Sequence, residues 1–361
     1  FPYYRDGAYC IGLGMTSREQ LLCFLSKADD PNSGGRQMPQ HYGHKDLKIV
    51  SQSSPTGTQF LQAVGCAMVC KMENMKQIVY VSAGEGTTSQ GDFHEALNWA
   101  SNTKAPVIFH IQDNEYAIST HRSEQTASSI YDLTSGYANL ARYNVDGTDF
   151  FETILAFKEA TQRARKGKGP SVIVSNVVRL LPHSSSDDQR KYRDEKALAQ
   201  DLNRDPLKIL ESQCVDADFI KVDEFEKIKT QIDKQVDDDA IWAEGQEYPD
   251  PSTALNYIYS NENIIEESNF VAVSEKIVFV DAINHALHEE MEFNRKMVVY
   301  GQDIADPKGG VFTATRGLSS NFGNNRVFNS PLAESSIVGT AIGMAIAAYK
   351  PVVEIQFGDY I

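Results

Sequence analysis

Two short polar motifs in the first half of the chain combine residue types that bind phosphate and a divalent metal. Gly84-Glu85-Gly86 follows an apolar run typical of a strand, and a helical pattern begins shortly after it. Glycine there permits a tight turn and close approach of a ligand, and a following helix N-terminus favours anions. The motif lacks the GK[ST] of a P-loop, and Ser89 stands where a dinucleotide fingerprint needs a third glycine. Alone, it is also compatible with an ordinary strand-to-helix turn.

The next predicted strand supplies the second motif. It ends at Gln112-Asp113-Asn114, and Asn114 lies thirty residues beyond Gly84. Two parallel strands joined by a crossover helix present their loops at one carboxyl edge, where ligands of open α/β sheets bind. Glu85 and Asn114 would offer carboxylate and amide oxygens, which suit Mg²⁺ when diphosphate oxygens complete its octahedron. The two motifs therefore predict a Mg²⁺–diphosphate site.

Helical and strand patterns alternate around these motifs. Apolar residues recur at helical spacing in residues 58–72, 92–101, 150–166, 283–291 and 339–349. Unbroken apolar runs predict strands at 78–81, 107–111, 171–178, 297–301 and 352–357. Asp149 and Glu152 resemble a capping box at the start of one helix. We expect an α/β fold in which a parallel sheet is flanked by helices, in two related domains of which the second is incomplete.

The predicted domains are separated by an acidic stretch. We expect a diphosphate- and Mg-binding domain at 1–215, a helical tail and acidic linker at 216–274, and the N-terminal part of a second domain at 275–361. The middle segment carries Asp237-Asp238-Asp239 and Glu266-Glu267. The chain begins with Phe1 rather than Met and ends just after a strand pattern, so we expect truncation at both ends.

Composition narrows the class of protein. Of the 361 residues, 41% are hydrophobic and 23% charged, which is typical of a globular protein. The net charge of −15 argues against a nucleic-acid surface, and no apolar run is long enough for a membrane span. The cysteines form no CxxC pair, and Cys66 and Cys70 have the spacing of buried helical thiols, so we expect a cytoplasmic location. The histidine pairs His41/His44 and His285/His288 lack a third ligand, so we expect no metal there.

The paired motifs resemble the thiamine-diphosphate motif, GDG followed one crossover later by NN, with Glu85 for the Asp and Asp113 for the first Asn. The segment GEGTTSQGDFHEALNWASNTKAPVIF is similar to the α subunit of the decarboxylating component of 2-oxo acid dehydrogenase complexes. This resemblance runs from Tyr3 to about Leu210. It implies thiamine diphosphate and Mg²⁺, with Glu85, Asn114 and Tyr116 as metal ligands.

The resemblance also assigns cofactor contacts. Tyr4-Arg5 resembles a pair whose guanidinium grips the diphosphate. Ser54-Pro55-Thr56 resembles the stretch that holds the aminopyrimidine, and the same loop resembles a K⁺ site near Ser53, Pro55, Thr58 and Gln59. Gln112 replaces a family Arg, which puts one phosphate contact in doubt. The implied contacts in this half are Tyr4, Arg5, Ser54, Thr56, Gly84, Glu85, Gly86, Thr87, Asn114, Tyr116, Arg179 and His183.

A second polar segment runs from Arg179 to Arg193. Read alone, it is a loop rich in hydroxyls and acids that could simply be solvated. It resembles the family loop RxxxHSxSD…YR, which folds over the cofactor mouth. By that resemblance His183 is a catalytic residue near the substrate and Arg179 lies near the diphosphate. Ser184 matches a serine that some relatives phosphorylate.

From Ile277 onward the chain resembles the β subunit of the same enzymes. The matching segments are Gly309–Phe312, Arg326–Phe328, Pro331–Glu334 and Glu354–Tyr360. Read alone, Glu334 is an acid before an apolar helix and could be a cap or a solvated residue. By resemblance it is the catalytic glutamate that hydrogen-bonds the pyrimidine ring, in a pocket lined by Leu332, Gln356 and Tyr360. The family's β half supplies a further histidine downstream of residue 361.

The resemblance implies a fused α–β enzyme. It would decarboxylate a 2-oxo acid oxidatively and pass the acyl group to the lipoyl group of an acyltransferase partner, as a homodimer equivalent to α2β2. GEG and the HSSSDD loop favour a branched-chain substrate such as 3-methyl-2-oxobutanoate. A pyruvate or acetoin dehydrogenase component is the alternative within this class. A non-catalytic fragment that retains only the cofactor-binding fold is the alternative outside it.

Overall fold

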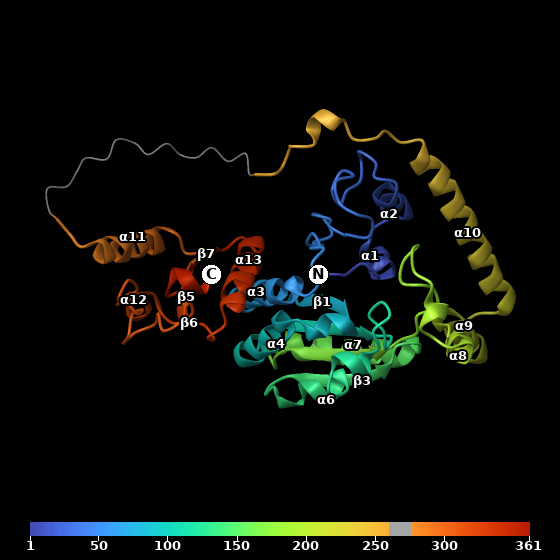
Figure 1. The fold of residues 1–361 in the computed structure, drawn as a ribbon, viewed down its shortest axis with the longest axis horizontal. Helices are drawn as coiled ribbons and strands as arrows, with labels where there is room; N and C mark the ends of the chain where they lie inside the picture. The colour runs from blue at the N-terminus through green and yellow to red at the C-terminus, as the bar shows by residue number, and fades with distance from the viewer. Residues whose placement is uncertain (260–275) are drawn as a thin grey trace.

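The computed structural model describes residues 1–259 and 276–361 and contains two α/β units (Figure 1). The predicted linker residues 260–274, including Glu266-Glu267, lie outside the described residues. No helix within the described ranges is both long and apolar enough to cross a membrane.

A four-stranded parallel sheet organises the first unit. Its strands are β1 (Val79–Gly84), β2 (Val107–Asp113), β3 (Ala141–Asp146) and β4 (Ser171–Asn176), in the order β1-β2-β4-β3. Val81, Phe109 and Val172 are buried in the sheet, as the unbroken apolar runs predicted. We did not predict β3, because its sequence ARYNVD is half polar; as an edge strand it buries little of its surface.

Helices cover both faces of this sheet, as predicted. On one face lie α3 (Thr58–Met72) and α4 (Gly91–Thr103), which share a core with β1, β2 and β4. On the other face lies α7 (Phe150–Arg165), which packs Ala156 and Ala160 against Ile108 and Ile173. That second face also borders a cavity of about 1420 Å³ between α7 and the N-terminal segment. The short elements between the strands are η1 (Glu85–Ser89), α5 (Arg122–Gln125), α6 (Ile130–Leu133) and η2 (Thr134–Gly136), and η3 (Gln189–Lys191) follows β4.

A helical tail returns to the N-terminal helices. The helices α8 (Glu195–Asn203), α9 (Pro206–Asp216) and α10 (Val222–Glu244) lead back to α1 (Gly7–Leu13) and α2 (Ser17–Phe24), and η4 (Pro251–Thr253) follows (Figure 1). Asp239 pairs with Arg18 at 2.7 Å, and Lys27 Nζ donates to the carbonyls of Glu244 and Gln246 at 2.8 Å. Asp239, which we predicted to lie in an acidic linker, is therefore buried in a helix contact.

The second unit repeats the pattern on a smaller scale. Its parallel sheet has the order β6-β5-β7, formed by β5 (Met297–Gly301), β6 (Val327–Asn329) and β7 (Lys350–Glu354). Its helices are α11 (Phe279–Phe293), α12 (Leu318–Phe322) and α13 (Glu334–Ile346), and η5 (Gly358–Tyr360) lies at the end. The parallel α/β fold predicted for both units is confirmed.

The two units meet where α13 crosses α3 (Figure 1). A Cβ on Gly65 would lie 2.1 Å from the Thr340 carbonyl oxygen, and one on Gly343 would lie 2.0 Å from that of Gln62. The backbones thus touch at glycines, because no side chain would fit between them. Tyr300 packs edge-on to Trp99 beside this crossing, so a single hydrophobic core runs through both units.

Several local predictions need correction. Asp149 caps α7 through the Glu152 amide, but the Glu152 carboxylate accepts from the Asp146 amide instead, so the capping box is only half formed. The helix predicted at 339–349 begins earlier, at Glu334, and ends at Ile346, because Ala348 has a φ of 63°, which an α-helix does not allow. The last strand ends at Glu354, since Gln356 turns toward β5. Cys70 is only partly buried; all five thiols are free.

Candidate functional site

The two motifs meet at the carboxyl edge of the first sheet. Gly84 ends β1 opposite Gln112 near the end of β2, in parallel register. The Asn114 amide donates to Glu85 Oε2 at 3.4 Å, and both side chains are buried, 4% and 2% exposed. The prediction that Glu85 and Asn114 lie together is confirmed.

These two side chains carry polar atoms without a partner among the residues the structure describes. They are Glu85 Oε1 and Asn114 Nδ2, while Asn114 Oδ1 accepts from the Tyr116 amide at 3.1 Å. Burial raises the pKa of Glu85. A buried polar atom left unsatisfied costs about 1–3 kcal/mol, so two such atoms in neighbouring side chains at a strand end favour a polar ligand there. The oxygens of Glu85 and Asn114, with the backbone at Tyr116, form a donor set that fits a hard cation bound to a diphosphate.

A cationic group lies beside this edge. The Arg5 guanidinium lies 5.5 Å from the ring centroids of both Tyr3 and Tyr4. A Cβ on Gly84 would lie 3.7 Å from Arg5 Nη2. Arg5 forms no ion pair with any described residue, so its charge is available to an anion at this edge.

Gly84 and Gly86 matter because they lack a side chain, and not because of an unusual backbone conformation. Gly84 has φ −80°, which any residue adopts, so the tight-turn explanation for it is wrong. A Cβ on Gly86 would lie 3.1 Å from Cβ of Ala117, so glycine there allows the 117–118 loop to approach. Thr87 is buried in η1, a 3₁₀ turn; α4 begins only at Gly91, so no α-helix follows the motif directly.

The segment from Arg179 to Arg193 folds over the same edge. Arg179 donates to the carbonyls of Ala117 and Ile118 at 3.1 and 2.9 Å and to the Tyr192 hydroxyl at 2.6 Å. Because Arg179, Gln189 and Arg193 are buried, the alternative of a solvated loop is wrong for these residues. The segment instead forms a wall of the site.

His183 lies in this wall next to the cations. Its ring meets the Tyr4 ring edge-on at 6.0 Å, and its amide donates to Asp187 at 2.8 Å. Burial lowers the pKa of His183, and the charges of Arg5 and Arg179 lower it further. A neutral imidazole at neutral pH can accept a proton, which is what a catalytic base requires. Tyr4, Arg5, Arg179 and His183 are thus brought together as predicted.

The predicted aminopyrimidine loop leads into a contact with the first motif, since a Cβ on Gly57 would lie 3.8 Å from Thr87 Cγ2. Ser54 and Thr56 are exposed, and the Ser54 hydroxyl lies 2.8 Å from His41 Nε2. Thr58 donates to the Pro55 carbonyl at 3.4 Å. The Gln59 side chain donates to the Ser82 carbonyl and accepts from the Gly57 amide. The K⁺ site predicted near Ser53, Pro55, Thr58 and Gln59 stays a prediction.

The second unit gathers its own polar group at a strand end. Gln302, directly after β5, donates to Glu334 Oε1 at 2.9 Å, and its carbonyl accepts from Gln356 at 3.4 Å. Leu332 and Tyr360 are 82% and 52% exposed. The predicted pyrimidine pocket is therefore an open surface around Glu334, and the interpretation of Glu334 as fully solvated is wrong.

The two polar groups lie in different units of the fold. α13 contacts the first unit through α3 and α4, where Ser336 donates to Glu95 at 2.7 Å. Within the described ranges, no hydrogen bond, ion pair or ring contact joins the Glu334 group to the Glu85–Asn114–Arg5 group.

Three residues of the site were missed from sequence. Gln302 follows the carboxyl end of β5, so the rule that found Asn114 could have found it. Arg122 binds Asp113, and Gln112 binds Asp6 at 2.6 Å; both partners come from segments with no recognisable pattern. Asp113 and Gln112 thus have structural partners where the family motif has Asn and Arg.

Comparison with known proteins gives two family matches. Residues 1–252 match the family described as dehydrogenase E1 component, and residues 275–361 match the transketolase pyrimidine binding domain. A relative named 2-oxoisovalerate dehydrogenase subunit alpha, from Bacillus subtilis, is 39% identical over 72% of this chain and 78% of its own length. The mitochondrial subunit of that name from Mus musculus is 36% identical over 72% of this chain. The chain spans 59% of that mouse relative and 50% of its Arabidopsis thaliana counterpart, which is 33% identical.

Proposed function

The chain belongs to the dehydrogenase E1 component family, and on that premise we propose that it takes part in the oxidative decarboxylation of a branched-chain 2-oxo acid such as 3-methyl-2-oxobutanoate. The cofactor is thiamine diphosphate, as in this family. The observation that carries the proposal is the buried pair Glu85–Asn114, whose polar atoms have no partner among the described residues, with the Arg5 guanidinium nearby beside Gly84.

We assign the cofactor's two ends to the two polar groups. Glu85, Asn114 and the Tyr116 backbone would hold Mg²⁺, while Arg5, Arg179 and the backbone at Gly84, Gly86 and Thr87 would hold the diphosphate. Leu332, Gln356 and Tyr360 would line the pyrimidine pocket. When bound, thiamine diphosphate supplies a nucleophilic carbon and an electron sink for loss of CO₂.

The chain's own residues would manage the protons. Glu334 would share a proton with the pyrimidine ring nitrogen, and Gln302 leaves its Oε2 free for that contact. His183, kept neutral by burial and by Arg5 and Arg179, would exchange a proton with the substrate. The acyl group would then pass to the lipoyl group of an acyltransferase partner.

We further propose that a second copy of the chain completes each site, as a homodimer equivalent to α2β2. The support is the separation of the two groups within one chain and the exposure of Leu332 and Tyr360. In a closed C2 dimer, the open surface around Glu334 in each copy would cover the Glu85–Asn114 group of the other copy. The dimer would therefore contain two complete sites.

Calorimetric titration with thiamine diphosphate and Mg²⁺ tests the cofactor assignment. Asn114→Ala should lower the affinity by at least about 100-fold, because both a metal ligand and its charge-assisted contacts are lost. Asn102→Ala, an exposed amide on α4, is the matched control and should bind normally. Equal affinity of the two variants would exclude this metal site.

The substrate is tested by CO₂ release from 3-methyl-2-oxobutanoate and from pyruvate. We expect the branched substrate to be preferred; preference for pyruvate would support the pyruvate or acetoin component. Cofactor binding without release from either substrate would support a non-catalytic fragment, an alternative favoured by the open pyrimidine surface.

A further inference from the structure

Asp6, next to the proposed diphosphate-binding Arg5, has a buried carboxylate that the proposed mechanism does not use. Its Oδ1 accepts from Gln112 Nε2 at 2.6 Å, on β2. Its Oδ2 accepts from the Ser82 hydroxyl on β1 and from the Tyr3 amide at 3.3 Å. Burial raises the pKa of Asp6, which shows how costly the site is for a charge. Such a group is retained only where its hydrogen bonds serve a purpose.

Those bonds fasten a turn to the sheet. The Asp6 amide donates to the Tyr3 carbonyl at 2.9 Å, so residues 3–6 form a turn with Arg5 in its interior. The carboxylate then ties this turn to the ends of both motif-bearing strands. Through it, the position of Arg5 follows the positions of Gly84 and Gln112.

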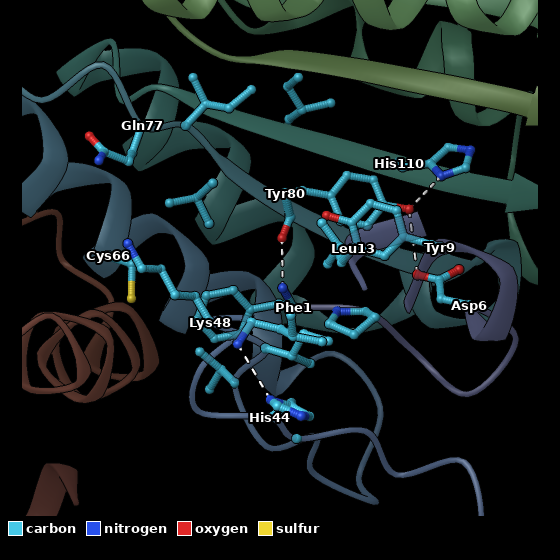
Figure 2. Close-up of a pocket in the computed structure, with 18 of the residues that line it drawn as sticks. Phe1, Asp6, Tyr9, Leu13, His44, Lys48, Cys66, Gln77, Tyr80 and His110 are labelled. Atoms are coloured by element: carbon cyan, nitrogen blue, oxygen red, sulfur yellow. Dashed lines mark hydrogen bonds between the residues drawn. The ribbon is translucent and has the colours of Figure 1, made fainter. Parts of the chain in front are cut away.

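Packing alone does not hold the turn. On its other side lies the cavity of about 1420 Å³, which is lined by Phe1, Arg5, Asp6, Tyr80 and His110. Figure 2 shows Asp6 on the wall of this cavity, beside Tyr80 and His110; the Tyr80 hydroxyl lies 3.4 Å from Asp6 and 2.9 Å from His110. The hydrogen bonds of Asp6 therefore act together with the contacts of the Tyr3 and Tyr4 rings in orienting Arg5.

We propose that Asp6 is a positioning residue that holds Arg5 against Gly84 for diphosphate binding. This rests on the proposed function, since Arg5 is assigned to the diphosphate there. Asp6 touches neither substrate nor cofactor and acts through Arg5. Its role is therefore visible as a coupling between the two residues.

The test is a double-mutant cycle with thiamine diphosphate and Mg²⁺ as the titrant. Asp6→Ala should weaken the affinity about tenfold in the wild-type background and less than about twofold in an Arg5→Ala background. Ser175→Ala removes a buried hydroxyl that bonds His110 at 2.9 Å rather than Asp6, and it controls for lost stability; its affinity should stay within about twofold of wild type. Asp6→Ser replaces Asp6→Ala if the alanine variant does not fold, with the same expectation.

Three outcomes overturn the inference. They are unchanged affinity in the Asp6 variant, a full tenfold loss in the Arg5→Ala background, and an equal loss in Ser175→Ala. If the wild-type chain itself does not bind the cofactor, the proposed function fails instead, which distinguishes the two failures. A tenfold loss that disappears without Arg5 supports the positioning role.

Discussion

The two units present their polar groups in opposite ways. In the first unit Glu85, Asn114 and Arg179 are buried, held by neighbouring backbone and by the loop that ends at Arg193. In the second unit Gln302 is the single side-chain partner of Glu334 among the described residues, and the neighbours Leu332 and Tyr360 are open to solvent.

This difference corresponds to the two ends of the proposed cofactor. A diphosphate with its cation needs fixed charges and oriented amides, which a sheet edge supplies before any ligand arrives. A pyrimidine ring needs apolar contact on its faces, which an open surface supplies only when something covers it. On the proposed function the first unit is preorganised, and the second would depend on assembly with another copy of the chain.

The largest expected effect comes from the second unit. Glu334→Gln keeps the hydrogen bond to Gln302 within reach but cannot supply a proton, so CO₂ release should fall about 10²–10⁴-fold while cofactor affinity is retained. Glu289→Gln is the matched control, because it replaces an exposed carboxylate on α11 with a carboxamide. Full activity of Glu334→Gln would refute the assignment of this unit.

Mixing variants tests whether the two units act in different copies. Asn114→Ala and Glu334→Gln should each be inactive alone. If each site is shared between two copies, random mixing should restore about a quarter of wild-type activity, since half of the dimers carry one intact site. No restoration after subunit exchange would place both halves of the site in one chain.

Much of the first unit could be predicted from sequence because its signals are local. Buried parallel strands are apolar along their length, as at Val107–Ile111, and the carboxyl-edge rule then placed Glu85 beside Asn114. The edge strand β3 was missed for the converse reason: residues with one exposed face lose the apolar signal.

What could not be predicted depends on contacts between distant segments. Asp6 meets Gln112 across 106 residues, and nothing in either local sequence marks the pair. The placement of Glu334 relative to Asn114 depends on the crossing of α3 and α13, where three glycines in two helices meet. A resemblance can name both residues, but only the packing decides whether one chain unites them.

The next largest effect concerns the polar interior of the first unit and its pH dependence. Burial lowers the pKa of His110 from 6.5 to about 4, while its ring bonds Tyr80 and Ser175 at 2.9 Å. The unfolded chain therefore binds a proton below pH 6.5 that the folded chain binds only near pH 4. Stability should fall as the pH falls through this window, by roughly 2 kcal/mol after allowing for solvent in the cavity.

Urea unfolding of wild type and His110→Gln between pH 7 and pH 4 measures this effect. The glutamine cannot titrate, so its curve should be flatter by that amount. Asp6 and Glu85, whose pKa burial raises, titrate in both proteins and cancel in the difference. Parallel curves would show that His110 gains a proton in the folded state as readily as in the unfolded one.

The smallest of these effects addresses the crossing that separates the two groups. Gly343→Ala places a Cβ 2.0 Å from the Gln62 carbonyl oxygen, and since that atom belongs to a helix backbone, α3 and α13 must move apart. We expect a loss of about 1–3 kcal/mol in unfolding free energy.

Gly12→Ala makes the same exchange on α1, where nothing lies within 4 Å, and helix propensity should raise stability by up to about 1 kcal/mol. Opposite signs for one chemical change would show that close backbone contact, rather than helix propensity, holds the units together. If both variants were equally stable in chemical unfolding, α3 and α13 would pack less closely than the structure shows. The crossing would then not fix the placement of the two polar groups.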